Sequence, residues 1–405
     1  MRYVGIVTAV AAALLAVSGA VPALGGAVEH ELTVAAGDTA YAEAPVWVPV
    51  KAPSAVKSAR LREVDGPPVP CQLVRSGANA WVVFVLRDLG PATTRHYTLT
   101  LSDESPAQRS RGVAVEPEGD AVTVTVDGDL FTSYRFADAP KPYCYPVIGP
   151  GGLPLTRNYP MKDVPGEAQD HAHHRSFWFT FGEVNGHDFW TEGEGRGRIV
   201  HREFELLESG PVVGIIRARN DWVAADGAKV CEDVRELRVY RTRNGRLLDF
   251  AVTIIPVGEP VHFGDTKEGM FAFRVASSME VPRGAGRIVN SEGQVNGEAW
   301  GKRAAWCDYS GPVDGRTVGI AILDHPDNFR HPTYWHVREY GLFAANPFGL
   351  RYYLGPEKAD EGLRVMPGTT LTFRYRVWLH DGAAPEADVA AVYAEYAHPL
   401  QVTVR

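Results

Sequence analysis

The sequence predicts an all-β protein: a large antiparallel β-sandwich with few helices, preceded by a small N-terminal β-domain. Apolar and polar residues alternate over many segments of roughly nine to eleven residues, the length of long strands. Hairpin signals such as Asp127-Gly128 and Asn244-Gly245 separate these segments. Long helical periodicity is nearly absent, so large curved sheets are favoured over alternating strands and helices.

The chain opens with the layout of a secretory signal peptide at residues 1–27. Arg2 is followed by an apolar run and then by the small residues Ser18-Gly19-Ala20. The run is short for a membrane span of about 20 residues, so we expect cleavage and a secreted or periplasmic protein. No later segment has about 18 uninterrupted apolar residues, so we expect no membrane association after cleavage.

Changes of composition predict how the rest of the chain is divided. A polar segment that contains Pro106 and lacks an apolar run reads as a linker. Ala-rich spacing over 385–397, behind an acidic first turn, predicts the one credible helix. We therefore expect a signal peptide at 1–27, a small β-domain at 28–103, a linker at 104–111 and a main β-sandwich with a C-terminal helix at 112–405.

Charge and cysteine content exclude some function classes. The net charge is −8, and the 41 Lys and Arg residues are scattered, which gives no support to nucleic acid as a partner. The four cysteines form no CxxC pair, so a thiolate zinc site is not expected. Disulfides and buried free thiols both stay open, as does the oligomeric state.

Alternation also places charges on the predicted strands. Arg217 and Arg219 share a face of one strand, and Glu232 and Glu236 share a face of the next, which a hairpin pairs with the strand of Asp249. These charges either line a concave, wet face or form cross-strand ion pairs on an exterior face. The sequence leaves both interpretations open.

Three segments concentrate titratable and aromatic residues: DHAHHRSFWFTFGEVNGHDFW (170–190), GDTKEGMFAFRVA (264–276) and HPTYWHVREYGLFAANPFG (331–349). The first holds four of the 13 histidines of the chain, at the entrance of a predicted strand, where loops carry function on a rigid scaffold. Histidine beside carboxylates and cations suits proton transfer near neutral pH, and Trp and Tyr offer flat faces for sugar rings.

These residue types predict roles in a carbohydrate site. His173 or His174 is the expected general base or acid, Glu268 its complement, and Arg175 and Lys267 the cations that stabilise developing charge. The expected substrate-binding residues are His171, Trp178, His262, Asp265, Tyr334, Trp335, His336, Arg338 and Asn346.

Two other classes of function are compatible with the same residues. A non-catalytic carbohydrate-binding protein would need the aromatic residues but not so many titratable groups. A copper or zinc enzyme could use His171, His173 and a distant histidine, because His-x-His places two imidazoles on one side of a strand. No HExxH motif is present, and we expect neither a metal nor another cofactor.

Over about residues 110–400 the three segments resemble a bacterial domain of unknown function called methane oxygenase PmoA-like. The resemblance implies an exported protein of polysaccharide-degrading bacteria, encoded near sugar oxidoreductases of the Gfo/Idh/MocA type, with a galactose-mutarotase-like sandwich. The methane-oxygenase name fits a bundle of membrane helices, so we interpret it as a misnomer. We therefore expect a secreted carbohydrate-active enzyme that cleaves a glycoside or keto-glycoside by acid/base elimination or hydrolysis.

Overall fold

The computed structural model describes residues 27–106 and 111–405. The predicted signal peptide falls almost wholly on residues 1–26, and part of the predicted linker on 107–110, which lie outside the described residues. Within the described ranges, no helix combines the length and the apolar character needed to cross a membrane.

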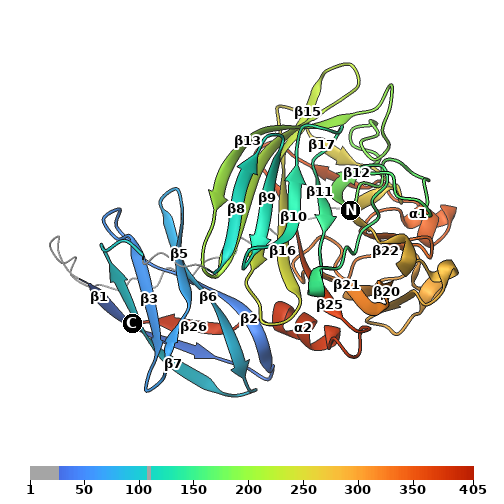
Figure 1. The fold of residues 1–405 in the computed structure, drawn as a ribbon. Helices are drawn as coiled ribbons and strands as arrows, with labels where there is room; N and C mark the ends of the chain where they lie inside the picture. The colour runs from blue at the N-terminus through green and yellow to red at the C-terminus, as the bar shows by residue number, and fades with distance from the viewer. Residues whose placement is uncertain (1–26, 107–110) are drawn as a thin grey trace.

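The larger part of the chain is an antiparallel β-sandwich of two eight-stranded sheets, as predicted (Figure 1). We call them the front sheet and the back sheet. The front sheet runs, in order, β22 (Trp335–Val337), β23 (Leu342–Ala345), β18 (Gly269–Arg274), β12 (Phe177–Phe181), β11 (Tyr143–Val147), β10 (Asp129–Arg135), β9 (Ala121–Val126) and β8 (Val113–Glu118). The back sheet runs β13 (Arg198–Glu208), β14 (Val213–Val223), β15 (Lys229–Tyr240), β16 (Arg246–Pro256), β25 (Leu371–Asp381), β21 (Arg316–Asp324), β20 (Trp306–Val313) and β19 (Arg287–Asn290).

The hairpin signals lie where the sequence predicts turns. Asp127 and Gly128 join β9 to β10 with Val126 opposite Asp129, and their φ angles are 55° and 94°. Both angles are positive, as a two-residue hairpin turn requires, and Asp-Gly tolerates them better than most pairs. Asn244 and Gly245 lie at the end of a longer connection, residues 241–245, between β15 and β16, where Gly245 has a φ of 60°.

The core lies between the two sheets. Phe177, Phe179 and Phe181 of β12 point inward and pack with Phe271 and Phe273 of β18 and with the inner residues of the back sheet. Because side chains alternate along a strand, the residues between these phenylalanines point to the outer face of the front sheet. That outer face carries the candidate site.

The N-terminal part is a smaller β-sandwich with its own core. One sheet has the order β26 (Gln401–Val404), β1 (Val28–Ala35), β7 (Thr94–Ser102), β3 (Ser58–Glu63), β4 (Pro68–Val69), and the other β2 (Tyr41–Pro49), β6 (Asn79–Leu89), β5 (Cys71–Ser76). Strand β26 differs from the prediction, which assigned residue 401 onward to the main sandwich. It pairs with β1, because Val402 and Val404 pack against the N-terminal core, and Figure 1 shows it among the N-terminal strands.

The back sheet is covered on its outer side. The β2-β6-β5 sheet packs against it through a shared apolar cluster, and the Trp47 indole donates a hydrogen bond to the Tyr240 hydroxyl at 3.0 Å. Helix α2 (Val389–Ala397) covers a neighbouring part through Val389, which packs on Ala321 and Leu323. This helix starts four residues later than the predicted 385–397, since Asp388 is in a left-handed conformation.

The remaining elements are short. Strands β17 (Val261–Phe263) and β24 (Leu363–Val365) form a two-stranded sheet, and helix α1 spans Leu350–Tyr353. Five 3₁₀ turns lie at Pro150–Gly152, Ser277–Met279, Val281–Arg283, Asn296–Ala299 and Pro356–Lys358 in the described residues.

The charged residues predicted on the back sheet form cross-strand ion pairs. Arg217 lies opposite Glu236 and binds it, and Arg219 binds Glu232 at 2.8 Å. This is the exterior-face interpretation rather than a concave binding face. Cys144, Cys231 and Cys307 are buried free thiols, and Cys71 is buried with its sulfur 3.3 Å from the carbonyl oxygen of Ala59.

Candidate functional site

One row of side chains crosses the outer face of the front sheet. The register places Tyr143 beside Trp178, Trp178 beside Ala272, Ala272 beside Ala344, and Ala344 beside His336. Residues paired across strands point to the same face, so the first and third polar segments meet on this surface. The two alanines in the middle leave space above the sheet for side chains from the loops.

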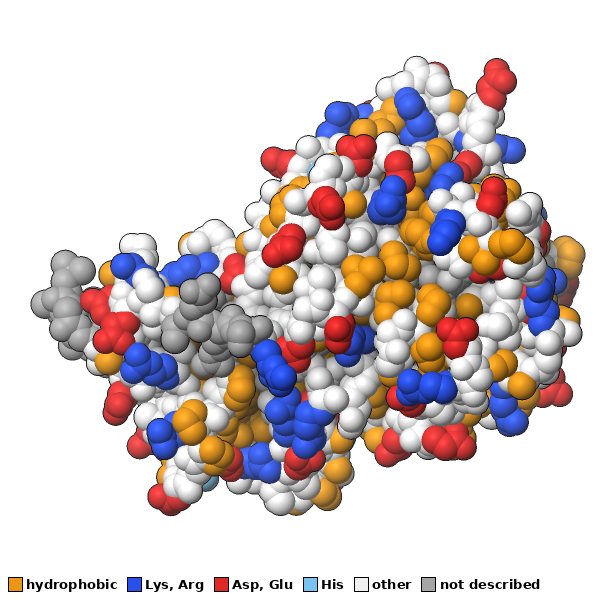
Figure 2. Space-filling model, in the orientation of Figure 1, with side chains coloured by type: hydrophobic (Ala, Val, Ile, Leu, Met, Phe, Trp, Pro, Cys, Tyr) orange, Lys and Arg blue, Asp and Glu red, His pale blue; other side chains and the backbone are white. Residues whose placement is uncertain are grey.

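Aromatic side chains fill that space. Trp190 packs on Trp178 with ring centroids 5.4 Å apart, and Tyr340, Tyr145 and Met161 pack around the same cluster. Trp178 is only 2% exposed, so it supports the site rather than offering a face to a ligand, contrary to its predicted substrate-binding role. Figure 2 shows hydrophobic side chains exposed between charged ones over the region where Figure 1 draws β11, β12 and β22.

Three histidines precede β12 and form a stack of rings, which we call the histidine end of the face. His171 lies parallel to His174 at 4.8 Å on one side and to Tyr340 at 5.3 Å on the other. His174 in turn stacks on Trp178 at 5.3 Å, and its Nδ1 lies 3.3 Å from Arg274. His174 is 1% exposed, so the prediction that it exchanges protons with a substrate is replaced by a positioning role.

Of the three imidazoles, His171 is exposed but bound to Asp170, His174 is buried, and His173 is half-buried. Its ring is half-buried against His174 and Trp190, at 4.4 and 6.4 Å between centroids. Burial and then the charge of Lys141 lower the pKa of His173 to about 4, so the ring is neutral at neutral pH. No residue of the described ranges accepts from or donates to its two nitrogens, which leaves them available to a ligand.

A buried ion pair lies beside His173. The Lys141 ammonium donates to Glu192 at 2.6 Å and to the Trp190 carbonyl at 3.4 Å, and it is almost fully buried. Arg175 binds the same carboxylate with two guanidinium nitrogens, at 2.9 and 2.8 Å. Burial lowers the pKa of Lys141, and Glu192 opposes that shift. Arg175 therefore orients Glu192, and its predicted role as a free stabilising cation does not fit this pairing.

Neither partner of His173 belongs to the predicted set. Lys141 lies between Pro140 and Pro142, outside the three segments, and Glu192 lies two residues beyond the first segment. The proximity of Glu192 to the histidine segment was the only signal in the sequence for this pair.

Asp170 fixes the position of His171 at the histidine end through an ion-pair network. It accepts from the Arg274 guanidinium at 2.8 Å, pairs with Arg157, and lies 2.8 Å from Nδ1 of His171. Both arginines are fully buried. Burial alone would raise the pKa of Asp170, but the charge of Arg274 and the bond to His171 lower it on balance. The ring of His171 is thereby fixed under Tyr340.

Lys267 and Glu268 lie on the same face at what we call the glutamate end. Their side chains form an ion pair and are each about one third exposed. Glu268 precedes Gly269, which pairs with the last residue of β12, whereas the histidines precede the first. Five strand residues therefore separate the two ends, roughly 15 Å of backbone. Glu268 contacts neither His173 nor His174 in the described structure.

His336 and Arg338 complete the glutamate end. Burial first, and then the charges of Lys267 and Arg338, lower the pKa of His336 to about 3, so its imidazole is neutral. Its Nδ1 is buried without a hydrogen-bond partner. Arg338 lies over the rings of Trp300 and Tyr340, each 5.7 Å from its guanidinium carbon. Tyr340 thus touches both the histidine stack and Arg338.

Aromatic rings extend the glutamate end beyond Trp300. Tyr353 packs edge-on against Trp300 at 5.4 Å and stacks on Tyr334 at 5.5 Å. Tyr334 is 9% exposed, so it lies at the border of the face.

Four predicted substrate-binding residues serve the scaffold instead. Trp335 points into the core, and its indole donates to the Ala304 carbonyl at 3.0 Å. His262 lies 2.6 Å from the Glu361 carbonyl oxygen, Asp265 accepts the amides of two loop residues, and the amide of Asn346 donates to the Thr266 carbonyl at 3.1 Å. Buried polar groups are as a rule hydrogen-bonded, and these hydrogen bonds hold the surrounding loops in place.

The residues proposed for a metal do not converge. His171 is engaged by Asp170 and by two stacked rings, while the ring of His173 lies edge-on to it, with centroids 5.7 Å and planes 73° apart. Across residues 27–106 and 111–405, no group of three His, Cys, Asp or Glu side chains is arranged to hold a metal ion.

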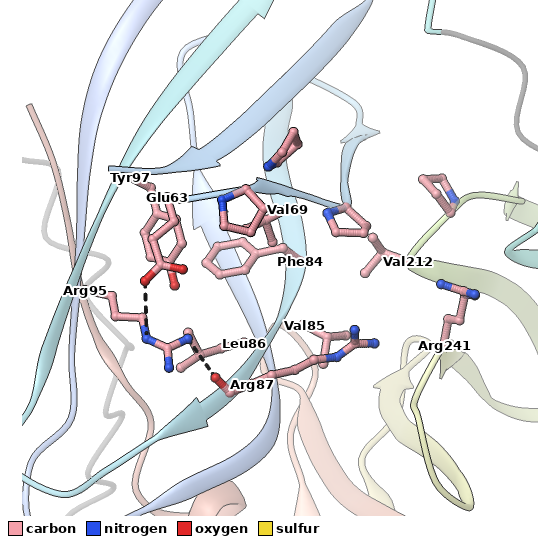
Figure 3. A pocket seen from close by; sticks show the side chains of 14 residues that line it. Glu63, Val69, Phe84, Val85, Leu86, Arg87, Arg95, Tyr97, Val212 and Arg241 are labelled. Atoms are coloured by element: carbon pink, nitrogen blue, oxygen red, sulfur yellow. Dashed lines mark hydrogen bonds and ion pairs between the residues drawn. The ribbon is translucent and has the colours of Figure 1, made fainter. Parts of the chain in front are cut away.

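A groove of about 240 Å³ lies elsewhere, between the two sandwiches (Figure 3). Phe84 and several prolines form its walls. Its three arginines each have a carboxylate partner: Arg87 with Glu43, Arg95 with Glu63 and Arg241 with Asp127. The groove shares no lining residue with the histidine or glutamate end, so it does not belong to the candidate site.

Comparisons with known proteins give a family but no activity. No curated protein matches the chain in sequence. An alpha-mannosidase from Enterococcus faecalis V583 superposes with a TM-score of 0.43 at 10% identity, over 93% of this chain and 46% of that one. A protein in the glycosyl hydrolase family 38 from Enterococcus faecalis gives 0.42 at 11%, over 93% and 47%. Scores this low do not bear on the activity of the chain.

A family model covers most of the main sandwich. It is described as a family of unknown function, DUF6807, and it matches residues 121–394, which include every residue of the histidine and glutamate ends. The chain belongs to this family of unknown function, DUF6807.

Proposed function

We propose that the protein is a secreted or periplasmic enzyme that cleaves a glycoside on the outer face of the front sheet. The observation that carries the proposal is His173: a neutral, half-exposed imidazole with both nitrogens available, next to a buried Lys141–Glu192 pair. A neutral imidazole accepts a proton at ambient pH, as a general base must. The adjacent ammonium of Lys141 favours negative charge that develops on a substrate.

Tyr340 is the proposed proton donor. Burial raises the pKa of Tyr340, so its hydroxyl stays protonated and can donate to a leaving oxygen. Ring contacts connect it to His173 through His171, with centroids 5.3 and 5.7 Å apart. Glu268, the complement that the sequence predicts, is a second candidate for this role because its charge acts on the same hydroxyl.

The partly exposed rings suit a sugar. Tyr340 and Tyr145 are half-exposed on the face, and flat apolar rings beside hydrogen-bonding groups favour carbohydrate faces. Elimination and hydrolysis both fit one base and one acid. We further propose that the methane-oxygenase name is a misnomer for this chain, because the described residues build antiparallel sandwiches.

Product analysis tests the proposal. Glycans, aryl glycosides and keto-glycosides are incubated with the parent protein and with His173→Gln, and the products are weighed by mass spectrometry. Hydrolysis adds one water to the products and elimination adds none, so the masses identify the reaction. Cleavage by the parent that His173→Gln loses supports the proposal. Saccharide binding without any product would favour a carbohydrate-binding protein.

A further inference from the structure

We infer that the carbohydrate carries a carboxylate and that Arg338 binds it; this inference rests on the proposed function. Its basis is that Arg338 has no ion-pair partner among the described side chains and lies over the ring of Trp300, whose indole nitrogen has no acceptor.

The carboxylates of the face are already paired with cations. Glu192 binds Lys141 and Arg175, Asp170 binds Arg157 and Arg274, and Glu268 binds Lys267. Arg338 differs, because no described side chain forms an ion pair or a hydrogen bond with it. Arg274 also pairs with Glu280 at 3.5 Å. Among these cations, Arg338 is the one for which the described structure shows no carboxylate partner.

The surroundings of Arg338 fix its guanidinium and keep its charge uncompensated. Trp300 and Tyr340 each lie 5.7 Å from its guanidinium carbon, which restricts the long side chain. His336 beside it is neutral, with a pKa of about 3, and the charge of Lys267 is taken up by Glu268. A restricted, planar guanidinium matches a carboxylate with two parallel hydrogen bonds, which a neutral hydroxyl cannot supply.

A donor without an acceptor lies beside Arg338. The indole nitrogen of the half-buried Trp300 is buried and lacks a hydrogen-bond partner in the described structure. An indole N–H can only donate, so a partner must bring acceptor oxygens. Arg338 lies over the ring that carries this donor, 5.7 Å from the ring centroid. A ligand rich in acceptors and bearing a negative charge satisfies both groups together.

Matched saccharide pairs test the inference. Binding of oligogalacturonide, its methyl ester and the neutral galacto-oligosaccharide of the same length is measured by calorimetry, and the glucuronide series is measured in parallel. The parent protein should bind the acid form at least about tenfold more tightly than the ester, the scale of a charge-assisted hydrogen bond. Arg338→Ala should abolish this preference, and Arg338→Lys should retain only part of it.

The control is Arg198→Ala, which removes an exposed arginine of β13 and the same unit of charge. It should keep the preference of the parent, and thermal unfolding should show that all variants fold. Equal binding of acid, ester and neutral forms by the parent would overturn the inference while leaving the proposed function standing. A sulfated saccharide bound as tightly as the uronide would also overturn the carboxylate assignment. Absence of binding by every saccharide would reject the proposed function itself.

Discussion

The imidazole of His171 lies parallel to the phenol ring of Tyr340, with centroids 5.3 Å apart and planes 5° apart. One residue precedes β12 and the other precedes β23, two strands away in the front sheet. Asp170 fixes the imidazole, and Arg274 and Arg338 lie over the phenol at 4.9 and 5.7 Å. This stack joins the histidine end to the glutamate end, so residues from distant parts of the chain belong to one surface.

Tyr340→Phe should lower turnover by roughly a hundredfold, the usual scale for a lost general acid. The phenylalanine ring can keep the stack on His171, so the thermal unfolding midpoint should change little. Glu268→Gln should lower turnover less than tenfold, because Glu268 touches neither histidine. Steady-state rates of the two variants test this assignment. A larger loss of turnover in Glu268→Gln than in Tyr340→Phe would assign the general acid to Glu268.

The rate constant kcat/KM should fall on the acid side with a midpoint near pH 4. It reports the free enzyme, in which burial and the charge of Lys141 lower the pKa of His173 to about 4. The base works only when deprotonated, so activity is full above this pH and lost below it. A midpoint between 6 and 7, where unperturbed histidine titrates, would contradict the assignment.

Lys141→Met should raise the pKa of His173, because the charge of Lys141 follows burial as the second cause of its depression. Met preserves much of the side-chain volume, and Arg175 continues to pair with Glu192. The imidazole signals are followed by NMR against pH, and the acid midpoint of kcat/KM should rise with them. Lys302→Met, at an exposed position, is the control and should move neither. An unchanged pKa of His173 in Lys141→Met would show that the charge of Lys141 does not lower that pKa.

Stability should fall as the pH drops from 6.5 towards 3, in part through His336. The unfolded chain protonates this residue near pH 6.5, but the folded protein does so only near pH 3. Between these two pH values the unfolded state binds one more proton than the folded state. The contribution of His336 to the free energy of unfolding is therefore full above pH 6.5 and is lost as the pH falls towards 3. His336→Gln should reduce the loss between pH 7 and pH 4 by about 2–3 kcal/mol in urea unfolding. The control is His96→Gln, at an exposed position, which should lose as much unfolding free energy between pH 7 and pH 4 as the parent.

Trp335→Ala should destabilise the fold by about 3–5 kcal/mol, as for other buried tryptophans. Trp335 is fully buried in the main core, where it stacks near Phe343. The urea midpoint gives the value. A stable variant with impaired saccharide binding would instead restore the substrate-binding role that the sequence predicts.

Local patterns carried most of the fold. Alternation and hairpin signals are properties of neighbouring residues, so the strands around Asp127-Gly128 and Asn244-Gly245 could be predicted. The pairing of strand β26 could not be predicted, because the sequence of a four-residue strand does not specify which distant sheet it joins. Its assignment depends on apolar contacts between the two ends of the chain.

For the site, the sequence could predict which segments contribute to it but not how their side chains pair. Period-two alternation in β12 separates Trp178 from the inward phenylalanines, and the same rule excludes Trp335 and His336 from sharing a face. The sequence could not reveal that Lys141 reaches Glu192, or that Asp170 is enclosed by Arg157 and Arg274. Such pairs follow from the register of strands far apart in the chain, which no local pattern specifies.

The most direct test of the account is the turnover of His173→Gln on the saccharide that the parent cleaves. Gln keeps a polar side chain of similar reach but cannot take up a proton. Thermal unfolding should confirm an intact fold, since His173 contributes little to the core. The account predicts a rate at least about a hundredfold below the parent. Turnover by folded His173→Gln at the rate of the parent would show that the histidine end is not catalytic.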